Sequence, residues 1–214
     1  MDHYFSPAPG PDSRSPGSVR IVRFAAGARD FQLASGGGVF SAGRLDPGTA
    51  VLLRKAELPG PDETRPLLDL GCGYGPIACV LASTAVRAPV WAVEVNGWAR
   101  ELAARNAAAL GVGDRVRVVA PDRVPDRVGF GQIWSNPPVR IGKPALHALL
   151  GRWLPALLPD GVAWLVIARH LGGDSLHRWL AGQGWVAVRH ASQQGYRVLR
   201  VSRGDQPARA GRPD

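Results

Sequence analysis

The sequence has very little cysteine and no long apolar run. Cys72 and Cys79 are the only cysteines among 214 residues. No cluster of metal-ligating residues surrounds them, so we expect no metal site and interpret both as small core residues. No stretch approaches the ~20 apolar residues of a membrane-spanning helix. The chain also begins without the basic patch and apolar run of a signal peptide, so we expect a protein of the reducing cytoplasm.

Lysine is nearly as scarce. Lys55 and Lys143 are the only two lysines, so arginine supplies almost all of the basic charge behind the formal net charge of +9. A positive field of this strength favours an acidic partner such as RNA. The abundance of alanine, glycine and proline allows a second interpretation, in which a GC-rich coding bias contributes part of the arginine excess. Charge alone leaves both interpretations open.

The chain length suits one domain with two short tails. Residues 1–18 are rich in proline, glycine and serine, and we expect them, like residues 204–214, to form flexible tails. Between the tails, residues 19–203 form the predicted domain. Its first part, residues 19–56, starts with two alternating segments that indicate a β-hairpin and continues into a helix. Asp46, followed by proline, is a favourable start for that helix.

The remainder, residues 66–203, alternates strand and helix. Short apolar segments predict strands, and glycine or proline ends the helical segments between them. The predicted strands are residues 67–70, 90–95, 116–119, 131–135, 162–168, 186–188 and 196–201, and the predicted helices are residues 76–86, 98–110, 144–158 and 174–181. This alternation predicts an α/β fold with a seven-stranded, mostly parallel sheet and helices on both faces. The short connection between the last two strands indicates that they are antiparallel.

A glycine-rich turn follows the first of these strands. Gly71, Gly73 and Gly75 are spaced two apart and leave space for a ligand to lie on the backbone. A dinucleotide fold uses a similar turn to donate helix N–H groups to a pyrophosphate. Here Pro76 lacks that N–H group, and Asp69 places a negative charge at the strand end. Both features favour a ligand with positive charge and no phosphate, such as S-adenosylmethionine.

Two further acids follow the second and third of these strands. Glu94 lies nineteen positions after Gly75, where a carboxylate can accept both hydroxyls of a ribose. Because the same residue would bind ribose in a dinucleotide fold, Glu94 does not distinguish the two cofactors. Asp122 is a candidate acceptor for an adenine amino group, and the neighbouring Asp126 is an alternative.

The end of the fourth strand carries the residues that select the chemistry. Asn136, Pro137 and Pro138 follow that strand directly. A planar amine or amide nitrogen is a poor nucleophile because its lone pair is delocalised. The side-chain oxygen of Asn136 and the backbone carbonyl of Pro137 would accept hydrogen bonds from its N–H groups and build charge on the nitrogen. The prolines hold that carbonyl outward in an extended backbone. The tripeptide therefore predicts methyl transfer to such a nitrogen.

With these segments identified, the sequence resembles the methyltransferase small domain family. The matching segments are Gly38-Val39-Phe40-Ser41, Leu45-Asp46-Pro47-Gly48-Thr49, Asp69-Leu70-Gly71-Cys72-Gly73-Tyr74-Gly75, Asn136-Pro137-Pro138-Val139-Arg140-Ile141-Gly142-Lys143 and Gly195-Tyr196-Arg197-Val198-Leu199. The nearest members resemble 16S ribosomal RNA guanine-N2 methyltransferases and their single-domain relatives. The resemblance implies a Rossmann-like class I methyltransferase fold, S-adenosylmethionine as methyl donor, and the Asn136-Pro137-Pro138 segment at the target amine. It also implies that a segment including Phe40 and Thr49 covers the cofactor.

The sequence departs from the family in two respects. Many enzymes of this chemistry have an aromatic residue after the two prolines, which stacks on the target base, whereas this chain has Val139. If the target is a base, Phe40 or Tyr74 is a candidate to stack on it. The larger guanine-N2 enzymes also carry a second, degenerate copy of the domain, which these 214 residues do not contain.

Basic residues near the tripeptide favour a nucleic-acid substrate. Arg140 and Lys143 are candidates to hold a substrate phosphate, and Arg20, Arg23 and Arg29 of the hairpin would extend that surface. The sequence thus predicts an S-adenosylmethionine-dependent enzyme that methylates the exocyclic N2 amine of a guanine in ribosomal RNA, without a metal or a membrane partner.

Three alternatives stay open at this point. In the first, the chain is a methyltransferase whose methyl acceptor is a protein amide or a small-molecule amine. In the second, the chain is a non-catalytic module that binds the nucleoside. The third, a nicotinamide-dependent oxidoreductase, is disfavoured by Pro76.

Overall fold

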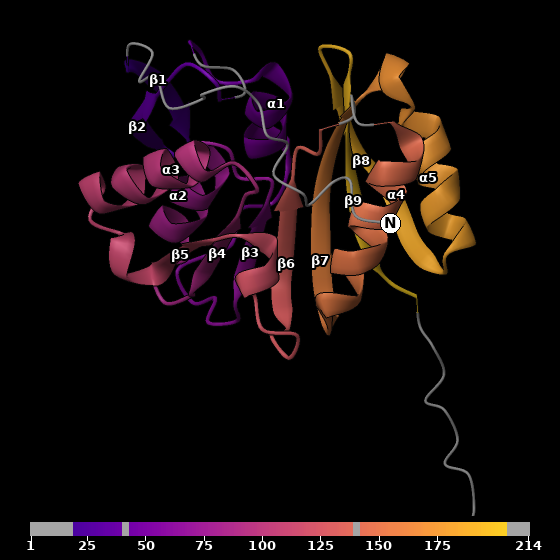
Figure 1. The fold of residues 1–214 in the computed structure, drawn as a ribbon. Coiled ribbons are helices and arrows are strands. Elements are labelled where there is room, and N and C mark those ends of the chain that lie inside the picture. The colour runs from indigo at the N-terminus through magenta and orange to yellow at the C-terminus, as the bar shows by residue number, and fades with distance from the viewer. Residues whose placement is uncertain (1–18, 40–42, 139–141, 205–214) are drawn as a thin grey trace, which may run out of the picture.

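Seven strands form one sheet in the order β5-β4-β3-β6-β7-β9-β8 (Figure 1). The computed structural model describes residues 19–39, 43–138 and 142–204, so both predicted tails, apart from Gly204, lie outside the described residues. The strands are β3 (Leu67–Leu70), β4 (Val90–Val93), β5 (Val116–Val119), β6 (Phe130–Ser135), β7 (Leu157–Ala168), β8 (Trp185–Gln193) and β9 (Tyr196–Arg203). Neighbours from β5 to β7 are parallel, whereas β9 is antiparallel to both β7 and β8. The predicted α/β fold and its antiparallel final pair are confirmed.

Helices cover both faces of the sheet, as predicted (Figure 1). One face carries α1 (Pro47–Lys55), α2 (Pro76–Thr84) and α3 (Gly97–Ala109), and the other carries α4 (Lys143–Trp153) and α5 (Gly173–Gly182). Successive strand residues point to opposite faces. Trp134 therefore packs in the core beneath the first group, and its neighbour Ile133 packs in the core beneath the second. Helix α4 ends at Trp153, before the predicted residue 158, and a 3-10 turn around Pro155 follows it.

Strand β7 is longer than predicted. It begins at Leu157, five residues before the predicted start. Its pairing with β6 shifts along this stretch, because Phe130 pairs with Leu157 but Gln132 pairs with Val162. The extra residues include proline, aspartate and glycine, which are typical of a turn. The sequence pattern therefore did not predict a strand there.

The predicted N-terminal hairpin is confirmed. Strands β1 (Arg20–Ala26) and β2 (Arg29–Ser35) are joined by the Gly27-Ala28 turn, which has φ angles of 55° and 60°. Two positive φ angles match the right-handed twist of the strands. Val22 and Leu33 on the inner face pack in a core cluster with residues of α3.

Asn106 of α3 joins the hairpin to the glycine turn. Its side-chain oxygen accepts from Ala34 N at 2.7 Å, and its amide nitrogen donates to the carbonyls of Ala34 at 2.9 Å and Tyr74 at 2.8 Å. Because Asn106 is 3% exposed, these bonds are shielded from water. One buried amide thus fixes three segments relative to one another.

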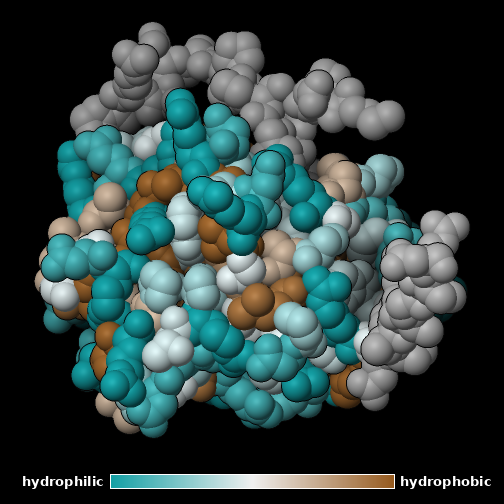
Figure 2. Space-filling view, turned by 90° about the horizontal axis from the view of Figure 1, so that it is seen from below, coloured by the Kyte–Doolittle hydropathy of each residue, from teal (hydrophilic) through white to brown (hydrophobic). Residues whose placement is uncertain are grey.

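The surface seen from below shows no large hydrophobic area. Hydrophilic and hydrophobic residues are interspersed on this face (Figure 2). Among the described helices, none combines the length and apolar character required to span a bilayer.

Candidate active site

The turn after β3 offers few N–H groups to a phosphate. Gly71 N and Cys72 N donate to the carbonyl of Val93 at 2.8 and 3.0 Å, and Gly75 N donates to the Cys72 carbonyl at 2.9 Å. Gly73 N donates to Glu94 Oε2 at 3.0 Å. These four N–H groups have protein acceptors, so the turn differs from the pyrophosphate cradle of a dinucleotide fold.

The three glycines of the turn have two different roles. A Cβ atom at Gly71 or Gly73 would meet no atom within 4 Å, so open space borders both residues. A Cβ atom at Gly75 would lie 3.1 Å from Cβ of Ala103 on α3. The lack of a side chain at Gly75 thus allows α2 to pack closely against α3, and its contact with a ligand stays a prediction.

Glu94 supports the turn from the neighbouring strand. Its Oε2 atom accepts a hydrogen bond from Gly73 N, and its Oε1 atom accepts one from Asn96 N at 2.9 Å. A carboxylate accepts about four hydrogen bonds in total, so Glu94 retains capacity for the hydroxyls of a ribose. Asn96 caps α3 and donates to the Gly38 carbonyl at 3.1 Å, which places the chain before α1 beside this carboxylate.

Asp69 is buried beneath the turn. The residue is 0% exposed, and its Oδ2 atom accepts from Ala78 N at 2.8 Å. Its Oδ1 atom has no hydrogen-bond partner among the described residues. Burial, with a smaller contribution from the charge of Glu94, raises the pKa of Asp69 to about 8. The expected negative charge at the strand end and the contact between Asp69 and a cofactor both stay predictions.

Asn136 lies at the same edge of the sheet as the glycine turn. Ser135, the last residue of β6, donates its hydroxyl to the Leu70 carbonyl at 2.8 Å, which fixes the two strand ends side by side. Asn136 Nδ2 donates to Asp46 Oδ1 at 2.6 Å and to Thr49 Oγ1 at 3.0 Å. Within the described parts of the chain, no hydrogen bond engages Asn136 Oδ1.

Sequence reasoning missed the second role of Asp46. The residue caps α1, as predicted, since its Oδ1 atom accepts from Thr49 N at 3.0 Å. The same oxygen also accepts from Asn136, which is 90 positions away in the sequence. Thr49 Oγ1 accepts from Asn136 as well, and the contact expected between Thr49 and the cofactor stays a prediction. One sequence signal pointed to this contact: Asp46, Thr49 and Asn136 all lie in segments that match the family.

The remaining predicted residues occupy different environments. Pro137 is buried and Pro138 exposed, while Lys143 is an exposed first residue of α4. Asp122 is exposed in a 3-10 turn after β5, with Oδ2 at 3.7 Å from Arg123 Nε. Phe40, Val139 and Arg140 lie outside the described residues.

Tyr74 cannot stack on a base in this structure. It is 3% exposed and packs in the core cluster with Val22 and Leu33. Burial raises the pKa of its hydroxyl above the usual range, with the charge of Asp46 adding to the effect. The hypothesis that Tyr74 stacks on the target is therefore wrong, because no ring face is open to a ligand.

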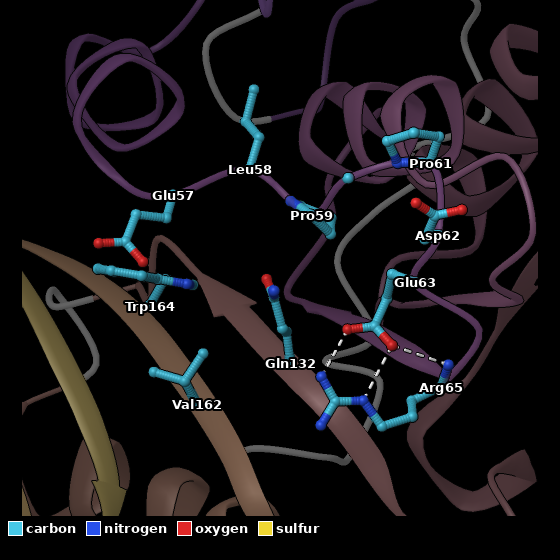
Figure 3. Close-up of a pocket in the computed structure, with 11 residues that line it drawn as sticks. Glu57, Leu58, Pro59, Pro61, Asp62, Glu63, Arg65, Gln132, Val162 and Trp164 are labelled. Carbon is cyan, nitrogen blue, oxygen red and sulfur yellow. Dashed lines mark hydrogen bonds and ion pairs between the residues drawn. The ribbon is translucent and has the colours of Figure 1, made fainter.

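A cavity of about 460 Å³ lies away from these groups (Figure 3). It is bounded by residues 57–63 and Arg65 on one side and by Gln132, Val162 and Trp164 on the other. Gln132 pairs with the first residue of β3, so the cavity is at the amino ends of the strands. Glu63 and Arg65 form two side-chain hydrogen bonds of 2.9 and 2.6 Å there, and these lower the pKa of Glu63.

Comparison with known proteins establishes the family. A family model described as the methyltransferase small domain matches residues 30–200.

The chain belongs to the methyltransferase small domain family.

Relatives of this methyltransferase chain include one that covers most of its length. The uncharacterized protein YbxB of Bacillus subtilis is 33% identical over 178 residues, which are 81% of this chain and 85% of that protein. The ribosomal RNA small subunit methyltransferase C of Hahella chejuensis is 44% identical over 107 residues, 49% of this chain and 30% of that protein. The chain therefore spans less than a third of the length of this second relative.

A solved structure shares the fold. The 16S rRNA N2 methyltransferase of T. thermophilus, determined in complex with AdoMet and guanosine, superposes with a TM-score of 0.68 at 22% identity. The match covers 88% of this chain and 52% of that one. The Rossmann-like class I methyltransferase fold expected from the sequence is confirmed.

The residues of this methyltransferase domain fit the family's methyl donor, S-adenosylmethionine. Open space borders Gly71 and Gly73, and the N–H groups of the turn already have protein acceptors. Both features suit a nucleoside ligand without phosphate. A group of three or more His, Cys, Asp or Glu side chains able to hold a metal ion does not occur in the described ranges.

Proposed function

We propose that this S-adenosylmethionine-dependent methyltransferase acts on the exocyclic N2 amine of a guanine in ribosomal RNA. The observation that carries the proposal is the fixed amide of Asn136, whose nitrogen donates to Asp46 and Thr49. Its oxygen is thereby left as an acceptor at the end of β6. An oxygen acceptor beside the glycine turn suits an acceptor substrate with N–H groups to donate.

Several residues of the chain would hold the methyl donor. Gly71 and Gly73 provide the open backbone surface, and Glu94 is the acceptor for the ribose hydroxyls. Asp122 is the candidate acceptor for the adenine amine. When bound, S-adenosylmethionine supplies an electrophilic methyl group.

The remaining chemistry belongs to the end of β6. Oδ1 of Asn136 and the carbonyl of Pro137 accept hydrogen bonds from the two N–H groups of the guanine amine. These bonds fix the plane of the amine and increase the electron density on its nitrogen. No side chain has to remove a proton first, because the proton leaves after the transfer. Orientation of the amine is therefore the main contribution of the protein.

Exposed basic residues at the carboxyl edge of the sheet support RNA as the substrate. Arg44, Lys143 and Arg169 are all exposed there, and no salt bridge engages them within the described parts of the chain. Arg29 of the hairpin is less suitable, because its Nη1 atom donates to the Ser83 carbonyl at 3.3 Å. The relative from Hahella chejuensis and the T. thermophilus structure are both named as ribosomal RNA methyltransferases.

Substitution of Asn136 by alanine tests the proposal. Loss of one preorganised polar group lowers turnover by about 10²-fold or more, whereas affinity for S-adenosylmethionine is expected to stay unchanged. Transfer of labelled methyl groups to ribosomal RNA measures turnover, and calorimetry measures cofactor binding. Gln183→Ala, an exposed amide at the end of α5, is the matched control and is expected to behave as the unmodified protein.

Three other results of this experiment would each contradict a different part of the proposal. Normal turnover of Asn136→Ala would show that Asn136 has no role at the amine. Label in a protein or a small amine, with none in RNA, would refute RNA as the acceptor. Absence of transfer to any acceptor, with intact cofactor binding, would indicate the non-catalytic module.

A further inference from the structure

We infer that Asp46 and Thr49 form an amide clamp that positions Asn136 and thereby selects acceptors that donate two hydrogen bonds. Asp46 is the N-cap of α1 and Thr49 lies in its first turn. Sequence reasoning assigned neither residue a role at Asn136. The inference rests on the proposed function, since it assigns the groups that hold its acceptor residue. Asp46 and Thr49 are positioning residues and act through Asn136.

The contacts of the amide clamp determine which way the Asn136 amide is turned. Asp46 Oδ1 lies 2.6 Å from Asn136 Nδ2, and Thr49 Oγ1 lies 3.0 Å from the same nitrogen. An ionised carboxylate accepts hydrogen bonds and cannot donate them. A flipped amide would place its oxygen against the Asp46 carboxylate, where two acceptors repel each other. The amide is therefore held with its nitrogen toward α1.

The amide clamp is itself held in place from two sides. Thr49 is 5% exposed, and its backbone N–H donates to Asp46 Oδ1 at 3.0 Å, so the two clamp residues are bonded to each other. A Cβ atom on Gly48 would lie 3.0 Å from Cε1 of Tyr196, so the first turn of α1 packs directly against that ring. The clamp thus depends on the packing of α1 on β9.

This arrangement affects both rate and specificity. Hydrogen bonds polarise one another, so a carboxylate bound to the amide nitrogen makes the Asn136 oxygen a stronger acceptor. With the amide nitrogen occupied, Asn136 and the Pro137 carbonyl offer two oxygen acceptors and no donor. A primary planar amine satisfies both acceptors. A hydroxyl satisfies only one, and a ring nitrogen with a lone pair satisfies neither.

Variants at the two positions separate clamping from helix capping. Serine at position 46 remains a good N-cap but is too short to reach Asn136, so Asp46→Ser tests the clamp without removing the cap. Thr49→Val removes only the hydroxyl. Each variant is expected to lower kcat by about 10-fold, with the melting temperature and the Kd for S-adenosylmethionine unchanged. The double variant is expected to lose more than either single one.

Conservative variants and a distant control complete the series. Asp46→Asn keeps the cap and an acceptor oxygen, and Thr49→Ser keeps the hydroxyl, so both are expected to retain most of the turnover. Thr84→Val is the matched control, because the Thr84 hydroxyl bonds, among the described residues, to carbonyls within α2 alone. It is expected to leave kcat unchanged.

A spectroscopic measurement tests the clamp without reference to activity. The side-chain amide protons of Asn136 are expected to exchange slowly with water in the unmodified protein and rapidly in the double variant. Normal kcat in the double variant, together with an inactive Asn136→Ala, would refute the clamp and leave the proposed function standing. Loss of S-adenosylmethionine affinity in Thr49→Val with unchanged kcat would also refute it, since Thr49 would then contact the cofactor. A fully active Asn136→Ala would refute the proposed function instead, and amide exchange would still decide the geometry.

Discussion

Asp69 combines complete burial with an ionisable side chain, and this combination makes stability depend on pH. Its folded pKa is about 8 against an ordinary value of 3.8. The folded state binds this proton more tightly than the unfolded state does. The contribution of Asp69 to stability is therefore full below about pH 4 and is lost as the pH rises to about 8.

Substitution of Asp69 by asparagine isolates this contribution. The asparagine oxygen can still accept from Ala78 N, as Asp69 does at 2.8 Å, but the side chain no longer titrates. The decline in the free energy of unfolding between about pH 5 and about pH 8 is expected to be smaller in Asp69→Asn than in the unmodified protein. Urea denaturation at the two pH values measures the difference. Equal declines in both proteins would show that Asp69 is ionised throughout.

At the scale of elements, the glycine turn between β3 and α2 separates ligand binding from packing. Gly73 and Gly75 have φ angles of 55° and 89°, so alanine at either position carries a similar backbone strain of about 1–2 kcal/mol. Only at Gly75 does the new Cβ atom also meet Ala103, at 3.1 Å. Overpacking adds a further cost of about 1–3 kcal/mol.

The two alanine variants are therefore expected to fail differently. Gly75→Ala is expected to lower the melting temperature more than Gly73→Ala does, because α2 must shift away from α3. Gly73→Ala is expected to lose more affinity for S-adenosylmethionine, because its Cβ atom enters the open space beside the turn. Calorimetric melting and cofactor titration measure the two effects. The reverse order in either measurement would contradict the assignment.

The order of elements was predictable because local signals agree with the tertiary structure. Glycine and proline mark nearly every helix boundary, and apolar runs mark the buried strands. The start of β7 was missed because the Pro159-Asp160-Gly161 sequence favours a turn. These residues lie in an irregular stretch of the strand, where β7 advances five residues while β6 advances two. The hydrogen bond between Asp46 and Asn136 spans 90 positions, and no periodic pattern reports an interaction of that range. The burial of Tyr74 was missed because it depends on the hairpin that packs over it.

At the scale of the whole molecule, the positions of the basic residues behind the formal charge of +9 indicate where RNA would bind. Arg44, Lys143 and Arg169 are exposed at the carboxyl edge, where the site lies. Arg87 precedes β4 and is therefore at the opposite edge, with Nη1 at 3.5 Å from Asp62 Oδ1. Binding of RNA through phosphates releases counterions, so affinity falls as the salt concentration rises.

Charge removal at the two edges is expected to have unequal effects on RNA binding. Glutamine in place of Arg44, Lys143 or Arg169 is expected to reduce the slope of log affinity against log salt by about 1 for each phosphate that the protein no longer neutralises. Arg87→Gln is the matched control and is expected to leave the slope unchanged. Filter binding over a range of salt concentrations measures the slopes. Equal reductions at both edges would indicate diffuse attraction rather than a defined surface.

The place of β9 between β7 and β8 has a consequence for the order of synthesis. Residues 196–203 emerge from the ribosome after every other described element, yet they carry the Tyr196 ring on which the first turn of α1 rests. A nascent chain stalled before them leaves the β7 backbone unpaired on one side and α1 without its support. Such an unfinished copy would contain the glycine turn and the Asn136-Pro137-Pro138 segment, yet we expect it to be inactive, and its unpaired strand would invite aggregation.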